Sequence, residues 1–301
     1  MSNIDRWIEK NIPDQAGRTI IVTGATSGIG YEAALFLVKR GAKVIIASRD
    51  ERKCNEAAQD IKNQVKDCLV EVIPLNLADL NSVHKFADTY REGHECLDTL
   101  VNNAGVMAVP KREMTTDGFE KHFGTNHLGH FALTGLLVDL LKRTTGSRVI
   151  TVTSFFHRAG RLTFFNLNSE VVYFKWRAYG RSKLANLMFA YELSRRLENN
   201  GGNPISVAAH PGYATTHLYP SNALFNLINP FWGQSPQMGA LPILYAAASP
   251  LTNSGDYIGP DGFLGQRGFP RKRKSSRASY NKDKARRLWE LSEELTGVSY
   301  L

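Results

Sequence analysis

Apolar and β-branched residues gather in short runs along the chain, and several of these runs contain no polar alternation. The runs comprise residues 19–23, 43–47, 70–74, 99–102, 148–153 and 205–210. A half-exposed strand alternates between apolar and polar positions, whereas a strand covered on both faces is apolar almost throughout. The pattern therefore predicts strands buried between two layers of helices.

The segments between these runs show helical periodicity. Gly41 suits a left-handed residue after the first helix, and Asp50 and Asp79 suit the N-caps of the next two. Helices are expected at about 29–40, 51–64, 79–92, 117–142, 178–199 and 235–248. The alternation predicts an α/β fold, a Rossmann-type doubly wound parallel sheet of about seven strands with helices on both faces. We expect a single domain over residues 1–301 that binds ligands at the carboxyl ends of its strands.

Residues 213–236 interrupt this rhythm. They combine three prolines and three asparagines with large apolar groups that a polar connector does not need. One interpretation is a lid that closes over an apolar substrate. A small satellite core packed on the main body explains the composition equally well.

Cysteine usage and the N-terminus favour a cytoplasmic protein. The three cysteines are odd in number and lack metal-type spacing, so we expect no disulfide framework. The first residues do not resemble a signal peptide, and the longest apolar run, residues 128–141, is too short to span a bilayer.

The positive charge is concentrated near the C-terminus. Residues 267–287 contain ten Lys or Arg and one Asp, which accounts for the whole net charge of +9. Within this basic C-terminal extension, 265–301, residues 271–274 could dock an acidic partner or membrane headgroups. A solvated loop entering the last helix is the preferred interpretation, and the chain has no nucleic-acid-binding signature. We expect neither nucleic-acid binding nor membrane contact.

A glycine-rich turn follows the first strand, in Thr23-Gly-Ala-Thr-Ser-Gly-Ile-Gly30. Glycines permit a tight turn, and the start of the following helix offers free N–H groups to a pyrophosphate. The spacing Gly-x-x-x-Gly-x-Gly differs from the more common dinucleotide fingerprint. The strand and helix on either side still favour a cofactor site formed by Gly24, Thr26, Ser27, Gly28, Ile29 and Gly30.

The end of the second strand favours NADP(H) as the cofactor. An acidic side chain there would bond the free 2′-hydroxyl of NAD, whereas an arginine pairs with the 2′-phosphate of NADP. The chain has Ser48 and Arg49 at this point.

Tyr179 and Lys183 are spaced to share one face of a helix. A phenol has a reference pKa of about 10, and a nearby cation favours the phenolate and so lowers that pKa toward a useful range for proton transfer. The spacing alone is weak support, because Tyr280 and Lys284 repeat it.

The order of several motifs resembles the short-chain dehydrogenase/reductase family over nearly the whole chain. These are the glycine turn, Asn102-Asn-Ala-Gly105, Asn126 in Gly-Thr-Asn-His, Ser154 after the fifth strand, Tyr179-x-x-x-Lys183 and His210-Pro-Gly212. Within the family, the chain is similar to the retinol-dehydrogenase-like branch in residues 123–131, in residues 181–187 and in the 25-residue gap between Ser154 and Tyr179. Its C-terminal motifs, residues 259–262 and 286–292, are similar to those of soluble bacterial members of that branch.

The resemblance implies a role for each matching position. Tyr179 would be the general acid or base, Lys183 would lower its pKa and bind the nicotinamide ribose, Ser154 would bond the reacting oxygen, and Asn126 would hold a water. The cofactor would further contact Asn76, Leu77, Asn102, Asn103, Ala104, Gly105, Pro211, Gly212 and Thr215. Asn76 stands where relatives usually have Asp, so the resemblance implies a modestly lower affinity for the cofactor in this chain.

The resemblance implies a reductase or dehydrogenase acting on an apolar aldehyde, ketone or secondary alcohol, with a homodimer possible through helices 117–142 and 178–199. His122, His127 and His130 are expected to be structural, with no metal site. A non-catalytic NADP(H) sensor or partner-binding protein, an epimerase or dehydratase, and a membrane-surface protein remain as alternatives.

Overall fold

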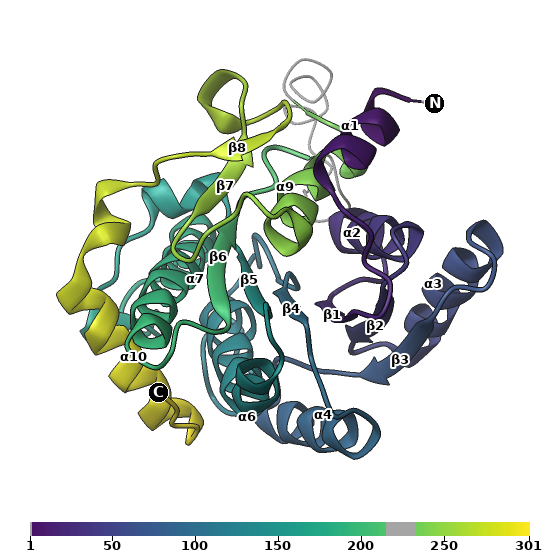
Figure 1. Ribbon diagram of the computed structural model, residues 1–301. Coiled ribbons are helices and arrows are strands. Elements are labelled where there is room, and N and C mark those ends of the chain that lie inside the picture. Colours follow the sequence, from purple (N-terminus) through teal and green to yellow (C-terminus); the bar gives the residue numbers. More distant parts are fainter. Residues whose placement is uncertain (1, 215–232) are drawn as a thin grey trace.

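The fold is built on one extended sheet, which the computed structural model describes together with its helices over residues 2–214 and 233–301 (Figure 1). The described strands run in the order β3-β2-β1-β4-β5-β6-β7-β8. Neighbouring strands pair in parallel through β7, and only the pair formed by β7 and β8 is antiparallel. The strands span Thr19–Thr23 (β1), Lys43–Ser48 (β2), Val70–Pro74 (β3), Thr99–Asn102 (β4), Arg148–Val152 (β5), Ile205–Ala209 (β6), Tyr257–Pro260 (β7) and Pro270–Lys272 (β8).

Successive strand residues face two separate apolar cores. Ile20 and Val22 of β1 belong to the core beneath α1, α2, α3 and α9, whereas Ile21 belongs to the core beneath α4, α6 and α7. Both faces of the strand are therefore covered, as its unbroken apolar run predicts. The helices span Asn3–Asn11 (α1), Gly28–Lys39 (α2), Glu51–Gln64 (α3), Leu80–Gly93 (α4), Lys121–Phe123 (α5), Gly129–Arg143 (α6), Lys175–Glu198 (α7), Pro236–Ala248 (α9) and Lys282–Thr296 (α10).

Asp50 and Asp79 cap the helices that the sequence assigns to them. The Asp50 carboxylate accepts from the backbone N–H of Lys53, and the Asp79 carboxylate accepts from those of Asn81 and Ser82. Gly41 follows α2 with φ +90°, a left-handed conformation that costs glycine little. These local expectations are confirmed.

The expected helix over 117–142 starts later, at Lys121, and contains an irregular turn. Helix α5 passes through a π-helical turn over Gly124–Leu128 directly into α6, with helical backbone angles at both junctions. Two glycines lie at tight contacts in and after the π-helical turn. A β-carbon at Gly124 would lie 2.5 Å from Thr115 Cγ2, and one at Gly129 would lie 2.4 Å from the carbonyl oxygen of Leu77. The π-helical turn therefore packs closely against the loops that precede it in the chain.

The expected solvated loop at 271–274 is also wrong in part. Arg271 and Lys272 belong to β8, the antiparallel edge strand, and Lys272 pairs with Asp256 at 2.9 Å. A short edge strand that carries charged side chains discourages pairing with the edge of another sheet. The basic segment thus has a structural role at the sheet edge.

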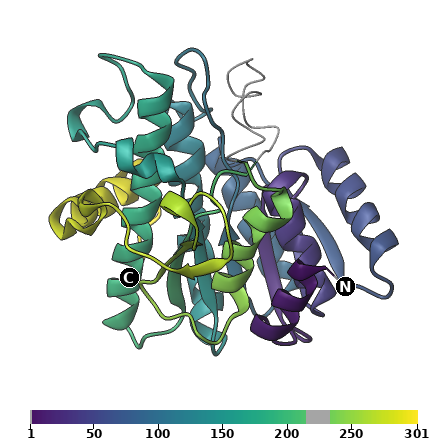
Figure 2. The ribbon, with the colours of Figure 1, turned by 90° about the horizontal axis from the view of Figure 1, so that it is seen from above.

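The C-terminal helix α10 packs against α7 (Figure 1), and its Trp289 is buried against Phe131 of α6 and Phe189 of α7. The two termini lie on opposite sides of the molecule (Figures 1 and 2). Within the part of the chain that the structure describes, each helix is too short or too polar to cross a bilayer.

Candidate active site

A cavity of about 420 Å³ lies at the carboxyl ends of the strands, where the sequence predicts it. The loops after β1 to β6 and one face of α7 form its wall. Every described candidate residue lines this cavity except Asn102 and Asn126, and Thr215 lies outside the described residues. Those that do are Gly24, Thr26, Ser27, Gly28, Ile29, Gly30, Ser48, Arg49, Asn76, Leu77, Asn103, Ala104, Gly105, Ser154, Tyr179, Lys183, Pro211 and Gly212.

The glycine turn presents backbone amides to the cavity. Gly24 and Gly28 adopt φ values of +68° and +58°, and a β-carbon at Gly24 would lie 2.9 Å from Ala104. Helix α2 begins at Gly28, and among the described residues the Ser27 side chain makes no capping bond to its first turn. The free N–H groups and the positive end of the helix dipole therefore fit an anion such as a pyrophosphate.

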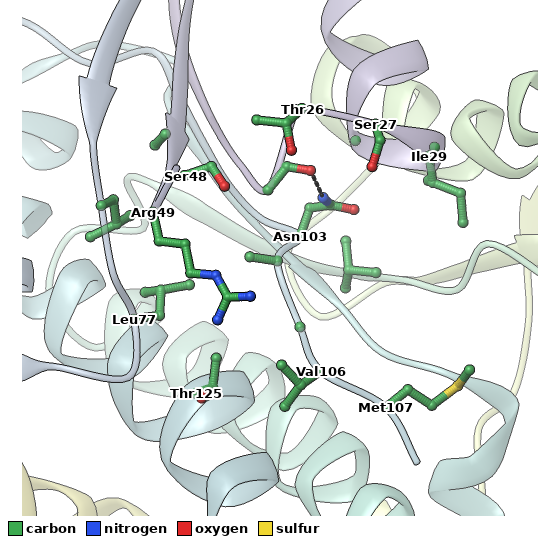
Figure 3. A pocket seen from close by; sticks show the side chains of 18 of the residues that line it. Thr26, Ser27, Ile29, Ser48, Arg49, Leu77, Asn103, Val106, Met107 and Thr125 are labelled. Carbon is green, nitrogen blue, oxygen red and sulfur yellow. Dashed lines mark hydrogen bonds between the residues drawn. The ribbon is translucent and has the colours of Figure 1, made fainter. Parts of the chain in front are cut away.

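Cations line the cavity just after β2 and on α5. Arg49 is exposed, and Figure 3 shows its side chain reaching into the cavity beside Leu77. Lys53, one turn later, also lines the cavity and lies 3.9 Å from Asp50. Lys121 lines it from α5 and pairs with Glu113 at 2.6 Å. The sequence reasoning missed both lysines, although the spacing of four residues from Arg49 could have indicated Lys53.

Tyr179, Lys183 and Ser154 converge on one wall. Tyr179 and Lys183 lie one turn apart on α7, both buried, with Lys183 Nζ 5.9 Å from the Tyr179 ring centroid. The Ser154 side chain interacts with the Tyr179 hydroxyl and acts to lower its pKa. By contrast, Tyr280 is half-exposed on a short 3₁₀ turn before α10, and Lys284 lies on α10 itself, so the second pair shares neither helix nor cavity.

Burial dominates the protonation of this pair. Burial raises the pKa of Tyr179 to about 12, although the interaction with Ser154 acts in the opposite direction. Burial also lowers the pKa of Lys183 to about 8. Desolvation is the largest cause of both shifts, and the role of Lys183 in lowering the tyrosine pKa stays a prediction. The phenol keeps its proton at neutral pH.

Asn126 lies behind the wall rather than on it. Its Oδ1 accepts from the N–H of Val106 at 2.8 Å, and its Nδ2 donates to the Val106 carbonyl at 3.0 Å and to Ser182 Oγ at 2.9 Å. The side chain thus holds the chain after β4 against α7. A β-carbon at Gly105 would lie 3.4 Å from Lys183 Nζ, which shows how closely that chain passes the lysine.

Asn103, not Asn102, lines the cavity. Asn103 Nδ2 donates to the carbonyl of Thr23 at 2.7 Å and fixes the glycine turn to the end of β4. Asn102 is fully buried and donates instead to Thr134 Oγ1 at 3.0 Å. The expectation that Asn102 lines the cavity is wrong because the strand alternates faces at this residue.

The three histidines each have their own partners. His122 pairs with Glu120, and His127 lies 3.0 Å from Ser292 Oγ. Burial lowers the pKa of His130 to about 4, so its ring is neutral. Its Nδ1–H donates to the Asn126 carbonyl at 3.0 Å, and its Nε2 accepts from the Thr23 hydroxyl at 2.9 Å. His130 therefore joins the glycine turn to the π-helical turn.

The expected lid lies largely outside the described residues. Thr215 and the segment 215–232 belong to that undescribed part. The two ends of the expected lid are held together, because the N–H of Gln234 donates to the carbonyl of Tyr213 at 2.9 Å and Gln234 Nε2 donates to the carbonyl of Pro211 at 2.7 Å.

Comparisons with known proteins agree with this geometry. A family model described as short chain dehydrogenase matches residues 18–223, which include the glycine turn and the Tyr179–Lys183 pair. Retinol dehydrogenase 12 of Mus musculus is 41% identical over 292 residues, covering 94% of this chain and 88% of that protein.

Solved structures also match. A crystal structure of an uncharacterized protein from Mycobacterium paratuberculosis has a TM-score of 0.82 and 42% identity, covering 97% of this chain and 98% of the other. The RhlG/NADP active-site complex of Pseudomonas aeruginosa has a TM-score of 0.62 and 25% identity, covering 81% of this chain and 94% of the other.

Proposed function

The chain belongs to the short-chain dehydrogenase/reductase family and is an oxidoreductase, and we propose that it transfers hydride between NADP(H) and an apolar aldehyde, ketone or secondary alcohol. One observation carries the proposal. Ser154, Tyr179 and Lys183 line the same cavity as the glycine turn and Arg49. Proton-transfer groups and a phosphate cradle thus lie within reach of one bound dinucleotide.

The chain's own residues supply position and a proton. A bound NADPH would supply the hydride. Tyr179 holds its proton at neutral pH and would donate it to the carbonyl oxygen, while Ser154 hydrogen-bonds the same oxygen and orients it. Lys183 would bind the nicotinamide ribose. A protonated phenol suits carbonyl reduction, in which the tyrosine acts as the acid.

The cations at the end of β2 support NADP(H) over NAD(H). Arg49 offers planar donors to a 2′-phosphate, and Lys53 adds a second positive charge one turn away. RhlG, one of the structures that this chain resembles, was solved as a complex with NADP.

Apolar residues on the far wall support an apolar substrate. Val106 and Met107 line the cavity, and Figure 3 shows both side chains across it from Thr26 and Ser27. The name of retinol dehydrogenase 12 indicates that this relative acts on retinol, an alcohol with a long apolar body.

The test is oxidation of NADPH with aliphatic, aromatic, retinoid and steroid carbonyls. We expect turnover with apolar carbonyls and a loss of about 10²- to 10⁴-fold in kcat for Tyr179→Phe, the range typical of a general acid. Tyr280→Phe is the matched control, because that tyrosine has the same spacing to a lysine but lies outside the cavity. Absence of turnover across the panel would favour a cofactor sensor instead.

Cofactor choice is tested by titrating NADPH and NADH side by side. Bonds to charged groups contribute about 1.5–3 kcal/mol, so we expect Arg49→Ser to raise the Kd for NADPH by about 10- to 100-fold and to leave NADH binding unchanged. Arg52→Ser is the control, because Arg52 pairs with Glu56 and does not line the cavity. Tighter binding of NADH by the unmodified chain would overturn the NADP assignment.

A further inference from the structure

A buried carboxylate–imidazole pair lies behind the cavity wall. Glu120 and His122 are both fully buried, and His122 Nδ1 lies 2.6 Å from Glu120 Oε1. The carboxylate also accepts from the backbone N–H groups of His122 and Phe123, each at 3.0 Å. These bonds satisfy both carboxylate oxygens and hold the pKa of Glu120 below its usual value despite its burial.

The hydrogen bonds assign one tautomer to His122. Its Nε2 lies 3.3 Å from the backbone nitrogen of Val109. A backbone N–H only donates, so Nε2 must be the acceptor and the ring proton must be on Nδ1. That proton is donated to Glu120. The carboxylate therefore fixes the orientation of the ring, and the ring fixes Val109.

His122 also contacts the catalytic tyrosine. Its ring centroid lies 6.0 Å from that of Tyr179 in an edge-on arrangement, and 6.4 Å from that of Tyr173. The Tyr173 hydroxyl donates to the Val109 carbonyl at 2.6 Å. The two polar groups of Val109 are thus held by His122 and Tyr173, two side chains from different parts of the chain.

Val109 belongs to the segment that forms the substrate side of the cavity. Val106 and Met107, three and two residues earlier, line the cavity opposite the cofactor cradle. The same imidazole therefore touches the proton donor and anchors the wall against which a substrate would lie.

We propose that Glu120 and His122 are positioning residues that set the distance between the Tyr179 hydroxyl and a substrate held against residues 106–109. The inference rests on the proposed function and deepens it. Neither side chain lines the cavity, so the pair acts through Tyr179 and Val109. A misplacement of the reacting groups by about 1 Å can reduce the rate about 100-fold. We therefore expect a small displacement of Tyr179 or of residues 106–109 to lower kcat measurably.

The main test compares His122→Phe with His122→Gln. Phenylalanine keeps a ring beside Tyr179 but removes both hydrogen bonds, so we expect kcat to fall about 10- to 100-fold with the Kd for NADPH unchanged. Glutamine can donate to Glu120 and accept from Val109, so it should restore most of kcat. His127→Phe is the matched control, since His127 is equally buried but faces Ser292 of α10.

Hydrogen exchange of residues 106–112 provides a readout that does not need activity. We expect faster exchange there in His122→Phe and exchange like that of the unmodified chain in His127→Phe. Unchanged kcat and exchange in His122→Phe, or equal losses of kcat in both phenylalanine variants, would overturn the inference. If the unmodified chain reduces no carbonyl, the proposed function fails, and the exchange of residues 106–112 alone decides whether His122 orders the wall.

Discussion

At the residue scale, burial of the Lys183 ammonium lowers the free energy of unfolding of the protein. The side chain is almost fully buried, and Nζ donates only to the carbonyl of Val152, at 3.2 Å, among the described residues. The same carbonyl accepts from Asn186 Nδ2 at 3.2 Å, so it keeps a donor without the lysine. An ammonium in such a place is expected to serve activity at a cost in stability.

We predict that Lys183→Met stabilises the cofactor-free protein at pH 7. Burial lowers the pKa of Lys183 from 10.5 to about 8, so between these values the unfolded chain binds more protons than the folded one. The stability of the unmodified chain therefore rises with pH through that window. The variant should be more stable by up to about 3 kcal/mol below pH 8 and should lose this advantage by about pH 10.5.

Urea unfolding of both proteins at intervals from pH 7 to pH 10.5 measures this difference. Tyr179, whose pKa is raised, titrates in both proteins and largely cancels from the comparison. A difference in the free energy of unfolding that stays constant across the range would contradict the burial of a charged lysine.

At the scale of elements, the close crossing of α6 over the loop after β3 shapes the cofactor side of the cavity. Gly129 begins α6, and a β-carbon there would lie 2.4 Å from the Leu77 carbonyl oxygen and 3.0 Å from Leu77 Cβ. Leu77 itself lines the cavity. A shift of α6 at Gly129 would therefore also move Leu77 and change the shape of the cavity.

We predict that Gly129→Ala destabilises the protein by about 1–3 kcal/mol, because the added methyl group must displace backbone, and that it weakens NADPH binding. Gly93→Ala is the control. Gly93 ends α4 with no atom within 4 Å of an added β-carbon, so alanine there should be neutral or stabilise by up to about 1 kcal/mol. Thermal unfolding and NADPH titration check both variants, and equal effects would contradict this link between α6 and the cavity.

At the scale of the whole molecule, α10 covers the two helices expected at a dimer interface. Trp289 lies 5.0 Å from Phe131 and 5.8 Å from Phe189, measured between ring centroids, and the Arg196 guanidinium stacks 4.4 Å from its ring. The apolar surfaces of α6 and α7 at these residues are thus covered by α10 of the same chain. We infer that a homodimer, if one forms, uses another face.

We predict that Trp289→Ala destabilises the protein by about 3–5 kcal/mol, because it leaves a large cavity between α6, α7 and α10. Trp289→Phe should cost less than about 1.5 kcal/mol, since the buried indole N–H has no hydrogen-bond partner among the described residues. Chemical unfolding measures both changes, and sedimentation shows whether exposing α6 and α7 alters the oligomeric state. A small effect of the alanine variant would show that α10 is only loosely attached.

The sequence by itself determined the features that neighbouring residues encode. Unbroken apolar runs, cap residues such as Asp50 and a glycine turn depend on local periodicity and local hydrogen bonds, so they were predictable. The order of these elements placed Ser48, Arg49 and the catalytic motifs at one end of the sheet, because parallel strands bring their carboxyl ends together.

Only the tertiary structure decided features that depend on distant contacts. The close packing of Gly124 and Gly129 against Thr115 and Leu77 joins separate segments, and β8 forms because the chain returns to pair with β7. The buried position of Tyr179, which raises its pKa, and the link from Glu120 through His122 to Val109 likewise join separate segments. Desolvation and packing depend on everything that surrounds a group in space, and no spacing along the chain specifies those surroundings.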